Sequence, residues 1–263
     1  MTTRAIIIKK QNTNEHDQWV TCYTEDFGKL KTIAKSILKP NSIQAHHLDI
    51  FNLVEFDLIN GRGMPIITGA QLIDSYMGIK NSLAKTAVAY FFAEAIDRMV
   101  FENDKDKELW SFFVSLLGKL DKEEDGFLKL FRSGQIRLLD ILGYFPETDL
   151  CKACGGDLNV NNFSAFNHVL GGIVCKKCFL DGHGGILISR EDFRMLTVRS
   201  VGSVRDDGNV QFQQFEHSEA KSDSVKRSNK QSDPTFRRSI LDGMFENIYG
   251  NKFYSLDLIN VVK

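Results

Sequence analysis

Apolar and polar positions alternate through about the first seventy residues of the chain, which is the pattern of β-strands with one buried face. The clearest stretch is residues 50–59, where Phe56 and Leu58 alternate with Glu55 and Asp57. The pattern predicts five strands, at residues 4–10, 19–24, 29–35, 50–59 and 65–73. Five such strands are typical of a small barrel, and the five-stranded OB fold is the commonest candidate. An SH3-like barrel would give a similar pattern.

Beyond residue 81 the apolar positions recur every three to four residues, which predicts helices. In residues 105–122, for example, Leu109, Phe113 and Leu120 share one face. The same reasoning predicts helices at residues 82–102, 105–122, 126–142, 189–199, 236–249 and 255–262. Residues 205–233 differ, because they carry five basic and six acidic side chains and few apolar ones. That composition is typical of a flexible insertion.

Four of the five cysteines form two Cys-x-x-Cys pairs, because Cys151 and Cys154 are followed after twenty residues by Cys175 and Cys178. This spacing predicts a zinc site, since each pair turns two sulfurs towards one point and zinc prefers four tetrahedral thiolates. Four protein ligands leave no open position for water, so the zinc would be structural. Two disulfides or unrelated thiols are the alternative.

These patterns divide an α+β chain into three parts. We expect an OB-fold barrel at residues 1–78 and a zinc module at residues 150–188. Residues 79–149 and 189–263 would form an α-helical C-terminal domain, into which the zinc module is inserted. Residues 205–233 would be a flexible insertion within that domain.

Composition narrows the class of protein. The chain has 263 residues, 43% of them apolar, and a formal net charge of −1. Any affinity for nucleic acid must therefore come from local patches. Only Cys22 lies outside the four-cysteine set, which is typical of a reducing compartment. The sequence shows neither a signal peptide nor a run of about 18 apolar residues, so we expect a cytoplasmic protein.

The common catalytic patterns do not occur in the sequence. It contains no P-loop, no Gly-x-Ser-x-Gly elbow and no His-Glu-x-x-His motif. We therefore expect a protein that is not an enzyme. The alternative is a nuclease or nucleotide-modifying enzyme whose site is assembled only in space.

Residues 28–48 hold four lysines and no acidic residue. The period of two places Lys29, Lys31 and Lys35 on one face of the predicted third strand. Such a surface suits a single strand of nucleic acid, because lysines neutralise phosphates and a nearby ring such as Tyr23 could stack on a base. The alternative is a solvated strand whose edge lysines prevent aggregation. The candidate nucleic-acid contacts are Lys29, Lys31, Lys35, Lys39 and Arg62.

Several stretches carry a family resemblance when taken in order. Two of them read Gly28-Lys-Leu-Lys-Thr-Ile-Ala-Lys35 and Gly171-Gly-Ile-Val-Cys175-Lys-Lys-Cys178. The full set is residues 28–35 with 39–40, 56–63, 138–146 with 151–156, 171–178, and 250–252 with Ser255. Together they resemble the RecO family of bacterial recombination mediators, over nearly the whole chain.

The resemblance implies a role in DNA repair and homologous recombination. It implies binding of single- and double-stranded DNA, annealing of complementary strands, and loading of RecA with RecR onto strands coated by single-strand binding protein. The acidic C-terminal tail of that coating protein would dock on the helical domain, with Arg132 and Arg137 as candidate contacts. The expected location is the cytoplasm, in association with the nucleoid. The alternative is a zinc-ribbon protein-interaction scaffold without DNA contact of its own.

Overall fold

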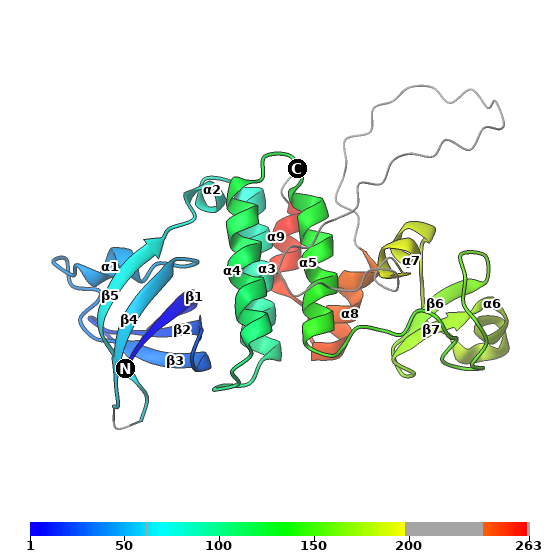
Figure 1. Ribbon diagram of the computed structural model, residues 1–263, viewed down its shortest axis with the longest axis horizontal. Helices are drawn as coiled ribbons and strands as arrows, with labels where there is room; N and C mark the ends of the chain where they lie inside the picture. The colour runs from blue at the N-terminus through cyan, green and yellow to red at the C-terminus, as the bar shows by residue number, and fades with distance from the viewer. Residues whose placement is uncertain (62, 198–238, 262–263) are drawn as a thin grey trace.

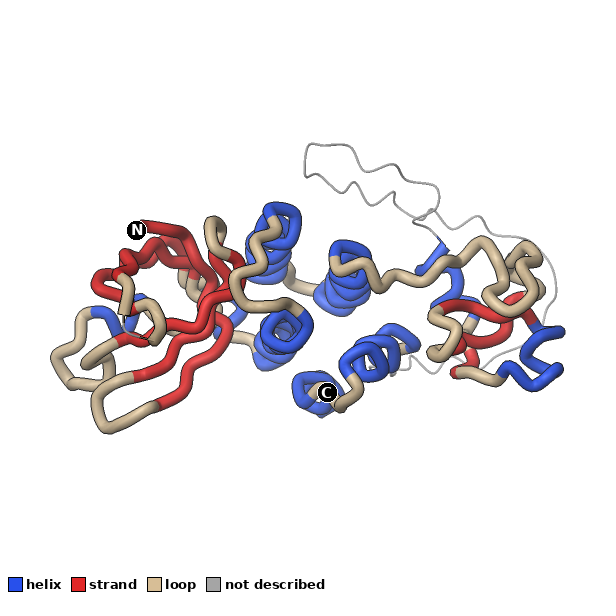
Figure 2. The backbone as a smooth tube through the Cα atoms, turned by 90° about the horizontal axis from the view of Figure 1, so that it is seen from below, coloured by secondary structure: helices blue, strands red, loops and turns tan. Residues whose placement is uncertain are grey.

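The computed structural model describes residues 1–61, 63–197 and 239–261. Arg62 and the predicted insertion at residues 205–233 lie outside these ranges. Along the long axis of the molecule the N-terminal barrel comes first, the helices lie in the middle, and the small sheet of the cysteine region lies at the far end (Figure 1). Figure 2 shows the same order from a second direction, with strands at both ends of the helices.

Five strands close into the barrel that the alternating pattern predicts. They are β1 (Thr2–Asn12), β2 (Gln18–Thr24), β3 (Gly28–Ala34), β4 (Leu53–Ile59) and β5 (Ile66–Asp74). Their order around the barrel is β1-β2-β3-β5-β4, and every pairing is antiparallel except that of β3 with β5. The short helix α1 (Gln44–His47) connects β3 to β4. This closed arrangement is OB-like, and the predicted fold class is confirmed.

The alternation in β4 sets which side chains enter the barrel. Phe56 and Leu58 are buried, whereas Glu55 and Asp57 are exposed. Burying each large apolar side chain stabilises the fold by about 1.5–3 kcal/mol. A slip of one residue in the strand register would reverse the two faces, so the hydrophobic pattern specifies the pairing.

The predicted long helices are present, and some begin slightly later than the periodicity suggests. They are α3 (Leu83–Met99), α4 (Lys107–Lys122), α5 (Phe127–Ile141), α7 (Arg190–Thr197), α8 (Ile240–Tyr249) and α9 (Tyr254–Val261). The four-residue helix α2 (Met77–Lys80), which the periodicity does not predict, precedes α3. The residues before α3 and α4 are caps. The Ser82 hydroxyl accepts from the Lys85 N–H at 3.4 Å, and Asp106 Oδ1 accepts from the Glu108 N–H at 2.7 Å. Such caps satisfy N–H groups that the first helical turn leaves unpaired.

Phenylalanines form the centre of the helical part. The Phe91 ring of α3 packs edge to face against Phe131 of α5 and Phe245 of α8, with ring centroids 5.0 and 4.9 Å apart. Gly134 allows α5 to approach α3 closely, because a Cβ there would lie 2.6 Å from the Phe92 ring. These contacts bring together helices from both ends of the C-terminal half.

The barrel interior forms a hydrophobic core of its own, which includes Val20 and Phe56, whereas Ile6 and Tyr23 of the barrel strands pack into the core of the helices. Gly28 at the start of β3 has a φ of +67°, and a Cβ there would lie 2.0 Å from the Asp104 carbonyl oxygen. A side chain at this position is therefore excluded both by the left-handed backbone and by space. The barrel is thus fastened to the α3–α4 loop by direct backbone approach.

The cysteine region is a three-stranded sheet with order β7-β6-β8. Its elements are β6 (Phe163–Asn167), β7 (Gly172–Cys175), α6 (Lys176–Cys178), the π-helical turn η1 (Phe179–His183) and β8 (Ile186–Leu187). Phe163 and Ile173 join the main core, while Ala165 and Val174 pack with the cysteines. The Phe163 ring stacks on Phe193 of α7 at 4.2 Å. In the ranges that the structure describes, no helix has the length and apolar character to cross a membrane.

Candidate metal centre and nucleic-acid interface

The four paired cysteines converge on one point. Their Sγ atoms all lie within 4.8 Å of one another, and those of Cys154 and Cys175 are 3.9 Å apart. Tetrahedral zinc with bonds of about 2.3 Å would place its sulfurs about 3.8 Å apart. A disulfide needs about 2.05 Å, so the geometry fits a metal and not the alternative of two disulfides.

Backbone hydrogen bonds shape the first cysteine turn and attach it to the sheet. The Gly155 N–H donates to the Cys151 carbonyl at 2.8 Å, and Gly155 has a φ of +71°, which glycine adopts without strain. The Lys152 N–H donates to the Ile173 carbonyl of β7 at 3.0 Å. A backbone hydrogen bond thus ties the first cysteine turn to β7, which ends at the second cysteine pair.

The thiols have different electrostatic surroundings. Burial by itself raises the pKa of the Cys151 thiol, but backbone N–H donors, first that of Cys175 at 3.3 Å, outweigh it and lower this pKa to about 6. Burial and hydrogen bonds to neighbouring thiols raise the pKa of Cys178 to about 12. Donors that favour one thiolate suit a metal site, since metal ligands bind deprotonated. Cys151 and Cys178 are buried, while Cys154 is exposed.

The predicted lysine face is present, but its first member is not available to a ligand. The inward residues Leu30, Thr32 and Ala34 are buried in the barrel, as the period of two requires. Lys29 points outward from the barrel and is covered by the helices, leaving it 8% exposed. Its Nζ donates to the Asp97 carbonyl of α3 at 2.7 Å.

Lys29 and Tyr23 are therefore corrections to the predicted interface. Burial lowers the pKa of Lys29, because the charged ammonium loses contact with water. Tyr23 is fully buried, and its hydroxyl donates to the Asp106 carbonyl at 3.3 Å. Both side chains join the barrel to the helices and cannot meet a nucleic acid.

The remaining candidates lie on the part of the barrel surface that the helices leave uncovered. Lys31 is half-buried on β3, whereas Lys35 and Lys39 are exposed just beyond the end of that strand. Arg62 lies outside the described residues. The structure thus keeps three of the five predicted contacts at the surface, and their role in binding stays a prediction.

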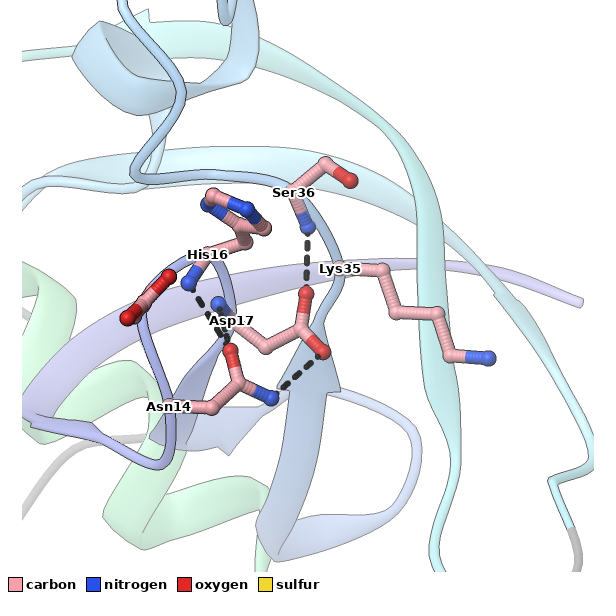
Figure 3. Close-up of a pocket in the computed structure, with 6 residues that line it drawn as sticks. Asn14, His16, Asp17, Lys35 and Ser36 are labelled. Atoms are coloured by element: carbon pink, nitrogen blue, oxygen red, sulfur yellow. Dashed lines mark hydrogen bonds between the residues drawn. The ribbon is translucent and has the colours of Figure 1, made fainter.

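A hydrogen-bonded loop fixes the backbone around Lys35. The Asp17 carboxylate accepts from the Ser36 N–H at 2.7 Å and from Asn14 Nδ2 at 3.1 Å, and the first of these bonds contributes most to lowering the pKa of Asp17. Asn14 Oδ1 in turn accepts from the backbone N–H groups of His16 and Asp17 at 2.8 Å. Figure 3 shows the Lys35 side chain extending away from Asp17 and the other bonded groups. The ammonium is presented to solvent by a fixed loop.

Sequence reasoning missed Trp19 as a candidate contact. Its side chain lies on β2 and is 36% exposed, and Lys31 Nζ lies 4.1 Å from the ring centroid. The sequence shows that Trp19 faces outward, because it lies two and four residues before Thr21 and Tyr23 on the same face of the strand. It does not show the strand pairing that places Lys31 beside Trp19.

The two arginines predicted to dock an acidic tail are already paired within the chain. Arg132 is 14% exposed and binds the buried carboxylate of Asp242 at 2.6 Å. Arg137 forms ion pairs with Glu108 and, at 2.9 Å, with Asp140. The structure argues against Arg132 as a docking residue, because its charge is neutralised inside the fold. The docking role of Arg137 stays a prediction.

An OB-like barrel on a helical body, with a four-cysteine site of metal-binding geometry, defines the class of this protein. Comparisons of the sequence show the family to which the chain belongs. Residues 1–76 match the family model described as "Recombination protein O N terminal", and residues 80–221 match "Recombination protein O C terminal". The chain belongs to the RecO family.

Curated relatives agree with this family. "DNA repair protein RecO" of Thermoanaerobacter sp. (strain X514) is 31% identical over 176 residues, which cover 67% of this chain and 70% of the relative. The protein of the same name from Acetivibrio thermocellus is 29% identical over 187 residues, 71% of this chain and 74% of the relative. That from Dehalococcoides mccartyi (strain ATCC BAA-2266) is 32% identical over 178 residues, 67% of this chain and 69% of the relative.

Proposed function

We propose that this protein acts in DNA repair and recombination as a mediator that binds single-stranded DNA on its barrel and anneals complementary strands. Duplex DNA would bind the same charged surface. The observation that carries the proposal is the open side of the OB-like barrel, where Lys31, Lys35 and Lys39 lie in a stretch without acidic residues. In this fold, the face of the second and third strands is a common site for oligonucleotides.

The mechanism follows from charge. Two DNA strands repel one another through their phosphates, and ammonium groups that neutralise phosphates let the strands approach. For a single strand, log affinity falls with log salt by about 0.7 per neutralised phosphate. Three lysines therefore supply a slope of about −2.

The partners of the proposed mediator follow from family membership. RecR and the acidic tail of single-strand binding protein would dock on the chain, so that RecA is loaded onto strands released from the coat. The expected place of action is the nucleoid, in the cytoplasm. The division into a barrel at residues 1–78, a metal module at 150–188 and a helical domain formed by the remainder assigns DNA binding to the first part.

Zinc is the metal that the four thiols suit best. Cys151, Cys154, Cys175 and Cys178 would hold it, and its two positive charges would offset their thiolates while joining the two cysteine turns. With all four coordination positions taken by protein, the metal would stabilise the module. It would have no open position at which to bind water or to catalyse a reaction on DNA. We infer a protein that is not an enzyme.

The test is fluorescence anisotropy of a labelled single-stranded oligonucleotide, titrated with the full chain at several salt concentrations. We expect log-linear weakening with salt and a large loss of affinity when Lys31, Lys35 and Lys39 are all changed to Glu. The matched control reverses Lys119 and Lys122 of α4 and Lys129 of α5, which are exposed, and so carries the same change in net charge. Absence of binding at low salt, or an equal loss in both variants, would refute the proposal and favour an interaction scaffold.

A further inference from the structure

The outward face of β2 and β3 combines an exposed indole with a cation. Trp19 of β2 is 36% exposed, and Lys31 Nζ of β3 lies 4.1 Å from the centre of its ring. Ile33, which pairs with Trp19 across the strands, is half-buried and extends the apolar surface beside the ring. Neither strand contains an acidic residue. The surface therefore offers an aromatic face and positive charge to the same ligand.

This indole lies between the two loops that border the ligand face of an OB fold. The β1–β2 loop, residues 13–17, ends two residues before Trp19. At the other side, the Ile33 N–H donates to the Pro65 carbonyl at 2.9 Å, at the base of the β4–β5 hairpin. The loop bonds of Asp17 to Ser36 hold the first border in place.

The contact between Lys31 and Trp19 is exchangeable. A cation above an exposed ring is held weakly, because water competes for the ammonium. A nucleobase stacked on the indole gains contact area that the ammonium lacks, and base stacking on aromatic side chains is a general mode of single-strand binding. A phosphate next to that base would then attract the released ammonium.

We propose that Trp19 stacks on a base of single-stranded DNA and that Lys31 moves from the ring to an adjacent phosphate. This inference rests on the proposed function and deepens it, because it assigns the base contact within the same surface. It also gives the surface a preference for single strands. Bases in a duplex are already stacked on their neighbours, so only an unpaired strand offers a free base face.

Intrinsic fluorescence tests the contact directly, since the chain has two tryptophans. Trp110 of α4 is 7% exposed, so the Trp19→Phe variant reports the buried indole and the Trp110→Phe variant reports the exposed one. An oligothymidylate should quench at least half of the fluorescence of Trp110→Phe and leave that of Trp19→Phe unchanged. Equal responses of the two variants, or no response of Trp110→Phe at saturating DNA, would overturn the stacking.

Affinity supplies the second test. Trp19→Ala should weaken binding of the oligothymidylate by about 5- to 150-fold, while Trp19→Phe keeps most of the affinity. An abasic strand of the same length carries the phosphates without bases, so Trp19→Ala should bind it as the native chain does. Lys31→Ala should lower the salt slope by about 0.7.

The outcomes separate this inference from the proposed function. Salt-dependent binding that ignores Trp19 would refute the stacking alone and leave a phosphate-binding barrel. An equal loss on the abasic strand would show that Trp19→Ala acts through the fold, and would also refute the stacking. Absence of any DNA binding at low salt would refute both.

Discussion

Replacement of Asp242 by Ala should destabilise the protein strongly, although the residue lies far from the barrel. Its carboxylate is fully buried and accepts three hydrogen bonds: from Arg132 at 2.6 Å, from Gln135 at 2.8 Å and from the Ser239 N–H at 2.9 Å. The last bond is half of a capping box at the start of α8. One side chain thus ties α5 to α8 and satisfies the helix end.

The magnitude follows from what the change leaves behind. Removing one partner of a buried ion pair costs about 3–5 kcal/mol, because the other charge loses its counter-charge in a poorly hydrated site; the bond from Arg132 to Gln135 at 2.9 Å remains and moderates this cost. Arg132 keeps 14% exposure, so water relieves part of this cost, whereas loss of the cap adds about 1 kcal/mol. We expect the free energy of unfolding to fall by about 3–4 kcal/mol.

Urea unfolding followed by far-ultraviolet circular dichroism measures this change. The matched control is Asp257→Ala, since Asp257 also lies in the first turn of a C-terminal helix and pairs with Lys252, but its side chain is 53% exposed. That variant should lose at most about 1 kcal/mol. A loss of similar size in both variants would show that the buried ion pair contributes no more to stability than the exposed one.

A double variant then decides the role of Arg132. Combining Asp242→Leu with Arg132→Met removes both charges, so much of the lost stability should return. If Arg132 is structural, the double variant should also keep its affinity for an acidic peptide ending in Phe, the kind of tail expected on single-strand binding protein. Lost peptide binding in a stable double variant would restore Arg132 as a docking residue.

Three further predictions concern the metal, the barrel junction and pH. Metal analysis of Cys154→Ser should find well below one zinc ion per chain, whereas Cys22→Ala, outside the cluster, should retain the zinc. A full complement of zinc in Cys154→Ser would contradict the ligand assignment. Gly28→Ala should cost about 3 kcal/mol in urea unfolding through its left-handed φ and its clash with Asp104, against about 0.5 kcal/mol for Gly63→Ala in open space. Burial raises the pKa of Tyr76 to about 12 from an ordinary value of 10.0. The contribution of this shift to stability is therefore present below pH 10 and is lost as the pH rises towards 12. Tyr76→Phe should reduce this alkaline loss of stability, and an unchanged pH profile of unfolding would contradict the assignment.

The sequence was sufficient where the determining contacts are local. Two Cys-x-x-Cys pairs place two thiols each on tight turns, and the alternation in β4 separates Phe56 from Glu55 without knowledge of any partner. It was insufficient where the partner is distant. Nothing near Lys29 indicates that α3 covers it.

The same limit applies to Arg132, whose carboxylate partner lies 110 residues away along the chain. Trp19 is a different case, because its outward phase was readable from the sequence. The position of the cation beside it depends on how β2 and β3 are aligned. The alternating pattern predicts which side chains of each strand face outward, but it does not predict this alignment.

The packed junction between barrel and helices sets the position of one relative to the other. Ile6 and Tyr23 belong to the helical core and Gly28 abuts the α3–α4 loop, so rotation of the barrel relative to the helices would have to break packed contacts. A partner bound to the helices would therefore lie at a set distance from the β2–β3 face. If DNA and a partner both bind as proposed, transfer of a strand between them would favour movement of the DNA or the partner over bending of this chain.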